Sequence, residues 1–156
     1  MKFANDRFPT SLLNSEADFQ GIFSQWTFTL SDFQKWAIYS IYNSNDTLVC
    51  APTGSGKTLP AEFAIKHYTQ KGKTVIYTTP IKALSNDKLA ELSEKFPDIS
   101  FGLLTGDNKF NPEAQVLIMT TEIYLNTLLK LMFVKSQPDY DPNKLRLEFN
   151  MDIDLS

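Results

Sequence analysis

The segment from Ala51 to Thr58 has the residue types and the spacing of a loop that binds phosphate. It reads Ala-Pro-Thr-Gly-Ser-Gly-Lys-Thr, with its two glycines just before Lys57. Glycines let a chain curl so that backbone N–H groups converge on one anion, and a helix that follows the curl adds the positive end of its dipole. The residues expected to bind a nucleotide here are Thr53, Gly54, Ser55, Gly56, Lys57 and Thr58.

Lys57 and Thr58 have the most specific expected roles in this loop. Lys57, the candidate catalytic residue, would reach the β- and γ-phosphates of ATP, and the Thr58 hydroxyl would be a ligand of the accompanying Mg²⁺. The strict pattern begins with Gly, where this chain has Ala51, and a Gly-rich turn is the alternative. The apolar residues 48–50 predict a buried strand before the loop, with Cys50 in the core, and this context favours the nucleotide site.

Gln34 has two interpretations. It lies three positions after Ser31, at the start of a predicted helix that ends near residues 43–45. Ser followed by Gln at this spacing is a capping box, in which the amide closes the start of the helix. A carboxamide also matches the N6 and N7 atoms of adenine. The pattern by itself favours the cap.

Composition limits the classes of function. The 156-residue chain is about one domain long and is 42% hydrophobic, so it can bury a core. Its net charge of −3 argues against a protein that grips a duplex by bulk electrostatics, so any nucleic-acid contact must be local. A single cysteine suits a reducing compartment. No leader-like segment or membrane-length apolar run occurs, so we expect an intracellular protein, cytoplasmic or nuclear, neither secreted nor bound to membrane.

Strands and helices are predicted to alternate after the glycine-rich loop. Helices are expected over residues 58–70, 81–96 (with Thr79 as its cap) and 121–133; strands over 74–78, 99–104 and 116–119; residues 105–115 form a loop. This order predicts an α/β fold, a parallel sheet with helices on both faces. Ligands bind such sheets at the carboxyl ends of the strands, where the loop, Thr79-Pro80, residues 105–107 and Thr120-Thr121 should meet.

The domain organisation is predicted in three parts. Residues 1–25 form an N-terminal lead-in with a short helix from residue 15 to residue 26. Residues 26–134 form the main domain. Residues 135–156 form a polar loop and an edge strand, because apolar and polar residues alternate strictly from residue 145.

With these motifs in order, the chain resembles the first RecA-like domain of superfamily 2 helicases, a P-loop NTPase fold. More narrowly it is similar to the Ski2-like RNA helicases, the group related to Mtr4 and Ski2. The matching segments are Phe28–Gln34 for adenine recognition, Ala51–Thr58 for motif I, Tyr77–Asn86 for motif Ia, and Leu104–Asp107, Asn111–Ala114 and Met119–Ile123 for the later blocks.

This resemblance implies ATP with Mg²⁺ as cofactors and single-stranded RNA as partner, with DNA as a second possibility, in an RNA-decay or processing complex. It favours adenine reading by Gln34 and packing of Phe28 on the base. The residues implied to contact nucleic acid are Pro80, Lys82, Gly106, Thr120 and Thr121. Helix starts near Pro80 and Thr121 would offer N–H groups to phosphates, whereas without the resemblance an ordinary helix cap is the preferred interpretation of both.

One expected motif does not occur. The Asp-Glu-x-His segment that holds Mg²⁺ in this family is not found in the 156 residues, nor is a second RecA-like domain with its arginine fingers. We therefore interpret the chain as the N-terminal part of an incomplete domain. We expect it to bind ATP weakly and not to hydrolyse ATP or unwind RNA appreciably by itself. A non-catalytic nucleotide- or RNA-binding module and another P-loop ATPase are the alternatives.

Overall fold

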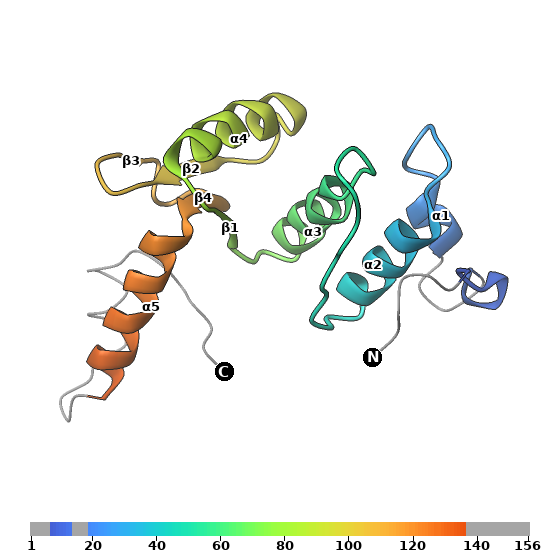
Figure 1. Ribbon diagram of the computed structural model, residues 1–156, viewed down its shortest axis with the longest axis horizontal. Helices are drawn as coiled ribbons and strands as arrows, with labels where there is room; N and C mark the ends of the chain where they lie inside the picture. Colours follow the sequence, from blue (N-terminus) through green and yellow to red (C-terminus); the bar gives the residue numbers. More distant parts are fainter. Residues whose placement is uncertain (1–6, 14–18, 137–156) are drawn as a thin grey trace. The chain divides into compact units, whose positions relative to one another are not determined.

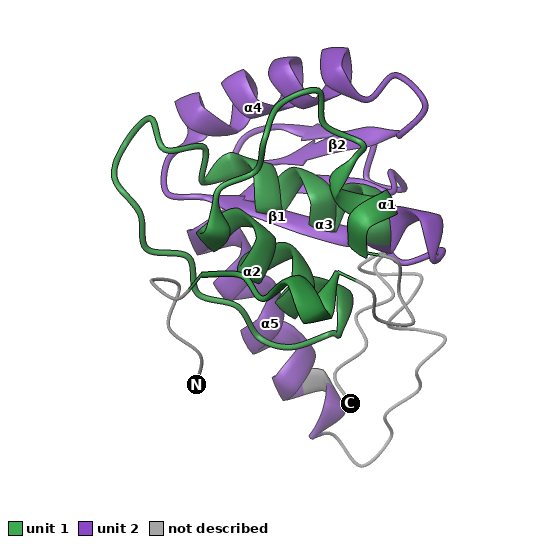
Figure 2. Ribbon diagram, turned by 90° about the vertical axis from the view of Figure 1, so that its right-hand side faces the viewer, with its two compact units in different colours: residues 1–67 green, residues 68–156 purple. Residues whose placement is uncertain are grey.

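The computed structural model describes residues 7–13 and 19–136, and the chain divides into two compact units. Unit 1 comprises residues 1–67 and unit 2 residues 68–156 (Figure 2). The edge strand predicted after residue 145 and the start of the helix predicted from residue 15 lie outside the described residues. The predicted domain boundaries at residues 25 and 134 stay predictions.

Unit 1 is helical and has an aromatic core. It contains a short 3₁₀ helix (Thr10–Leu12), α1 (Phe19–Phe23), α2 (Asp32–Tyr42) and most of α3 (Thr58–Gln70) (Figure 1). The helices predicted over 31–45 and 58–70 are therefore confirmed. Phe8 in the lead-in is only 5% exposed, and its ring makes T-shaped contacts with Phe23 and Trp36. The core residues are Phe8, Phe19, Phe23, Leu30, Ile38, Leu59 and Phe63.

The buried strand predicted over residues 48–50 is wrong for this structure. The segment is irregular, Leu48 is 80% exposed, and Cys50 is exposed rather than part of the core. A strand needs a neighbouring strand for its backbone N–H and C=O groups, and no described strand pairs with this segment. An apolar run alone was not sufficient to predict one.

Unit 2 contains a four-stranded sheet in the order β1-β4-β2-β3. β1, Val75–Thr79, and β2, Phe101–Leu104, pair in parallel with the central β4, Val116–Thr120. The residues of β4 from Val116 to Met119 are almost fully buried, as expected for a strand covered on both faces. β3, Lys109–Phe110, pairs antiparallel with β2 inside the region predicted to be a loop. The three predicted strands of this unit are confirmed.

Two helices cover opposite faces of this sheet. α4, Lys82–Lys95, lies on one face and α5, Thr121–Lys135, on the other (Figures 1 and 2). Ile123 and Tyr124 of α5 pack against Leu117 and Met119 of β4. Leu92 of α4 is fully buried. The predicted α/β class, with helices on both faces, is confirmed.

Candidate nucleotide site and nucleic-acid edge

The amide of Gln34 joins α2 to the glycine-rich loop. Its Oε1 accepts a hydrogen bond from the Ser31 N–H at 2.9 Å, and its Nε2 donates to the Gly56 carbonyl at 3.2 Å. The side chain is 6% exposed. The predicted capping contact is therefore present, and adenine reading stays a prediction. Sequence spacing gave no sign of the Gln34–Gly56 contact, because it links residues 22 positions apart.

The backbone of the loop has the conformation that its glycines allow. Gly54 and Gly56 both have φ of +81°, in the left-handed region that residues with a Cβ seldom adopt. Ser55 closes the turn between them, with its hydroxyl donating to the Pro52 carbonyl at 2.7 Å. Among the described residues, none accepts a hydrogen bond from the N–H of Gly54, Gly56 or Lys57. Three unsatisfied donors in a curled segment suit a bound phosphate.

The side chain of Lys57 reaches back to the start of this loop. Its Nζ donates to the Ala51 carbonyl at 2.5 Å, and the residue is exposed. Thr58 follows as the first residue of α3 and is partly buried. A charged phosphate oxygen is a stronger acceptor for an ammonium than a neutral carbonyl, so Lys57 can exchange one for the other. These residues thus fit a triphosphate with its Mg²⁺.

Thr53 and Phe28, the other two residues predicted to contact the nucleotide, are both exposed. Thr53 is exposed in the loop, and Phe28 is 55% exposed. Phe28 makes no ring contact with another aromatic side chain in the described part of the chain. An exposed ring is available to stack on a base, but its contact with adenine stays a prediction.

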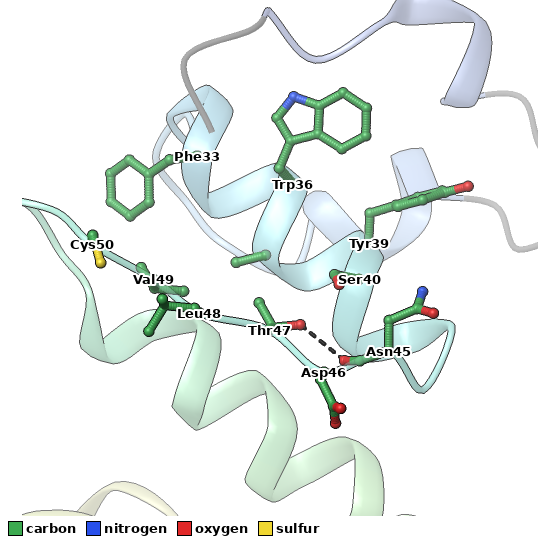
Figure 3. Close-up of a pocket in the computed structure, with 11 residues that line it drawn as sticks. Phe33, Trp36, Tyr39, Ser40, Asn45, Asp46, Thr47, Leu48, Val49 and Cys50 are labelled. Atoms are coloured by element: carbon green, nitrogen blue, oxygen red, sulfur yellow. Dashed lines mark hydrogen bonds between the residues drawn. The ribbon is translucent and has the colours of Figure 1, made fainter. Parts of the chain in front are cut away.

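A groove of about 810 Å³ lies elsewhere in unit 1, between α2 and the irregular segment from Asn45 to Cys50. In Figure 3 the side chains of Phe33 and Ser40 extend from α2, and those of Thr47 and Cys50 from the irregular segment. No residue of the glycine-rich loop lines it. The groove is therefore separate from the candidate phosphate site. One of its walls is the irregular segment that contains residues 48–50, which were predicted to form a strand.

In unit 2 the carboxyl ends of three strands lie at one edge. Thr79 of β1 is in register with Thr120 of β4, and Leu104 of β2 with Met119. The residues that follow these strands, namely Pro80, Gly106 and Thr121, therefore share that edge as predicted. How the glycine-rich loop of unit 1 is placed relative to this edge stays a prediction.

Threonine hydroxyls tie this edge together. The Thr79 hydroxyl lies 2.6 Å from the Ser85 hydroxyl, and both residues are buried. The Thr121 hydroxyl donates to the Thr79 carbonyl at 3.1 Å, which links the ends of β4 and β1. The prediction that Thr79 caps the next helix is wrong, because α4 begins at Lys82 with Ile81 as its N-cap. Thr79 instead ends β1, and its hydroxyl anchors Ser85.

Lys82 and Asp107 form an ion pair at the same edge. Asp107 also accepts a hydrogen bond from the Thr105 hydroxyl at 3.2 Å. The hydrogen bond from Lys82 is the main reason that the pKa of Asp107 is lowered from its ordinary value. Gly106, between Thr105 and Asp107 in the chain, is exposed, and a Cβ there would meet no atom within 4 Å apart from those of its chain neighbours. Sequence reasoning missed Asp107 as a partner of Lys82.

Comparison with known proteins decides the family. The model of the DEAD/DEAH box helicase family matches residues 31–146, which is most of the chain. The chain belongs to the DEAD/DEAH box helicase family. Within it, the predicted similarity to Ski2-like and Mtr4-like proteins is confirmed.

Three relatives of this helicase family illustrate the similarity. The antiviral helicase SKI2 of Saccharomyces cerevisiae is 46% identical over 105 residues, or 67% of this chain and 8% of the relative. The exosome RNA helicase MTR4 of Homo sapiens is 45% identical over 106 residues, 68% of this chain and 10% of the relative. The chloroplastic DExH-box ATP-dependent RNA helicase DExH15 of Arabidopsis thaliana is 47% identical over 111 residues, 71% and 10%.

The chain therefore spans a tenth or less of the length of these relatives. None of the helices in the part of the chain that the structure describes has the length and apolar character required to cross a bilayer.

Proposed function

We propose that this chain is the ATP-binding and RNA-contacting N-terminal part of the first RecA-like domain of an ATP-dependent RNA helicase. The observation that carries the proposal is the curled loop, in which Gly54 and Gly56 are left-handed, three N–H groups have no partner among the described residues, and the Lys57 ammonium bonds the Ala51 carbonyl. Its relatives are named as ATP-dependent or RNA helicases, which supports the same activity.

In the nucleotide site, the loop N–H groups hold the phosphates and Lys57 leaves the Ala51 carbonyl to contact the β- and γ-phosphates. The Thr58 hydroxyl would be a ligand of Mg²⁺, which would neutralise charge on the phosphates. Gln34 has a second N–H on Nε2 beyond the one that the Gly56 carbonyl uses, and this donor is suited to adenine. Phe28 packs on the base. Thr53 and Ser55 complete the loop.

In the nucleic-acid site, a single-stranded RNA backbone follows the strand ends of unit 2. Pro80, Gly106, Thr120 and Thr121 contribute backbone and hydroxyl groups, and Lys82 contributes a charge. Because the Thr121 hydroxyl is already donated to Thr79, its contact with phosphate is made by the N–H groups at the start of α5. Contacts of this kind discriminate little between bases, and DNA is the second candidate ligand.

Hydrolysis and unwinding require further parts in this proposal. An Asp-Glu-x-His segment and a second RecA-like domain would supply the Mg²⁺ carboxylate and the arginine fingers, and neither occurs in the 156 residues. We place the whole protein inside the cell, in an RNA-decay or processing complex, because one relative is named an exosome RNA helicase.

The test is binding of a fluorescent ATP analogue to the full chain in the presence of Mg²⁺. Lys57→Ala removes a charged hydrogen bond to phosphate and should weaken binding by about 10- to 100-fold. Lys73→Ala makes the same charge change at an exposed position outside the loop and should leave binding unchanged. Equal affinities for the wild type and Lys57→Ala would place the nucleotide elsewhere.

A further inference from the structure

Asp107 makes two contacts at the edge formed by the strand ends of unit 2. Its Oδ2 accepts from the ammonium of Lys82, the first residue of α4, and its Oδ1 accepts from the hydroxyl of Thr105. Thr105 is itself fixed, since it is 8% exposed and its N–H donates to the Asn108 carbonyl at 2.8 Å. The carboxylate is therefore held by a rigid neighbour while it pairs with Lys82.

The exposure of the pair suggests that its contact can be exchanged. The side chains of Lys82 and Asp107 are 49% and 68% exposed, and ion pairs at such solvated positions are weak. A carboxylate and a phosphate both compete for an ammonium, and the phosphate of an incoming backbone can reach the exposed side of Lys82. The hydrogen bond from Lys82 lowers the pKa of the Asp107 carboxyl, which like any solvated aspartate carries its charge at neutral pH.

We propose that Asp107 is a positioning residue that holds Lys82 at the strand ends and competes with an RNA phosphate for its ammonium. This inference rests on the proposed function, since it concerns the same RNA-contacting edge. Binding of RNA then exchanges one anion for another at Lys82. The net gain in affinity from Lys82 is small for as long as Asp107 carries its charge.

Removing the charge of Asp107 tests whether its carboxylate competes with phosphate for Lys82, while its contact with Thr105 is kept. Asp107→Asn keeps an oxygen that accepts from Thr105 but loses the negative charge. With the full chain and a fluorescent oligouridylate, we expect binding at low salt to tighten by about fivefold. Because no freed carboxylate takes up a cation when Lys82 turns to the phosphate, one more counterion is released in total, and the plot of log affinity against log salt should steepen by about 0.7.

Lys82 variants test whether the gain passes through this ammonium. Lys82→Gln alone should weaken binding, because it removes the ammonium that the phosphate contacts and leaves the Asp107 carboxylate without this ion pair. In the double variant with Asp107→Asn, the fivefold gain should disappear. If the double variant keeps the gain, the charge of Asp107 acts on RNA directly and the proposal is wrong.

Two matched controls exclude general effects. Asp98→Asn makes the same charge change before the start of β2, at the opposite end of the strand, and should leave the salt slope unchanged. Thr105→Val keeps the ion pair but removes the hydroxyl that orders Asp107, and it should not tighten binding. If Thr105→Val tightens binding as much as Asp107→Asn does, release of the loop is the cause and the proposal is overturned.

The failure of this inference can be told from failure of the proposed function. If the wild type binds RNA and Asp107→Asn binds with the same affinity and slope, only the role of Asp107 is wrong. If neither protein binds RNA even at low salt, the RNA-contacting edge itself is wrong and the inference falls with it.

Discussion

A single amide accounts for much of the order at the candidate nucleotide site. The spacing of Ser31 and Gln34 predicted a helix cap, and the structure confirms the contact at 2.9 Å. The second contact, to the Gly56 carbonyl, could not be predicted from spacing because it depends on how α2 packs beside the loop. Gln34 therefore couples the start of α2 to the conformation of the glycine that precedes Lys57.

The two loop glycines offer a matched pair of substitutions. Both have φ of +81°, so alanine at either position costs about 1–2 kcal/mol in backbone strain. A Cβ on Gly56 would also lie 2.6 Å from Gln34 Nε2, whereas one on Gly54 meets nothing within 4 Å. We expect Gly56→Ala to lower the free energy of unfolding by about 1 kcal/mol more than Gly54→Ala, because it displaces a buried amide.

Urea denaturation of both variants measures this difference. Adding Gln34→Ala should cost less in the Gly56→Ala background than in the wild type, since the amide contacts are already lost there. Equal losses of stability for the two glycine variants, or additive losses with Gln34→Ala, would show that Gln34 and Gly56 are not coupled energetically.

At the scale of elements, the same sequence pattern had two outcomes. Residues 116–119 and 48–50 are both apolar runs, yet only the first forms a strand. β4 has β1 on one side and β2 on the other, whereas residues 48–50 have no strand beside them in the described chain. The strand β3 was missed for another reason. Two residues are too few to show the alternation that identifies a strand.

Gly102 of β2 lies very close to the backbone of Asn111, the residue that follows β3. A Cβ at this position would lie 2.1 Å from the Asn111 carbonyl oxygen and 2.9 Å from Leu117, a contact that forces the backbone to move. We expect Gly102→Ala to lower the free energy of unfolding by about 1–3 kcal/mol, the usual cost of overpacking a core.

Gly106→Ala is the matched control for this prediction. Gly106 follows the same strand, and a Cβ there would meet nothing within 4 Å. Urea denaturation should find its stability close to that of the wild type. A Gly102→Ala variant as stable as Gly106→Ala would mean that Asn111 can withdraw and that the hairpin is not tightly packed.

At the scale of the whole molecule, the alternation of strands and helices predicted the sheet and the shared edge of its strand ends. It did not predict the ion pair of Lys82, because charge partners depend on the exact course of the loop after β2. The net charge of −3 had excluded bulk attraction to nucleic acid, and the edge agrees with this. Lys82, a cation at this edge, is paired with Asp107, so affinity for RNA must come from a small number of phosphate contacts.

This scarcity of contacts predicts a shallow dependence of RNA binding on salt. If two or three phosphates are held along the strand ends, log affinity should fall with log salt at a slope of about −1.4 to −2.1. Fluorescence anisotropy of the full chain with labelled oligouridylate across a series of salt concentrations measures the slope. Oligoadenylate is the control, since backbone contacts predict a similar slope for both bases. A slope several times steeper would require many more phosphate contacts than two or three, and a strong base preference would require base-edge contacts.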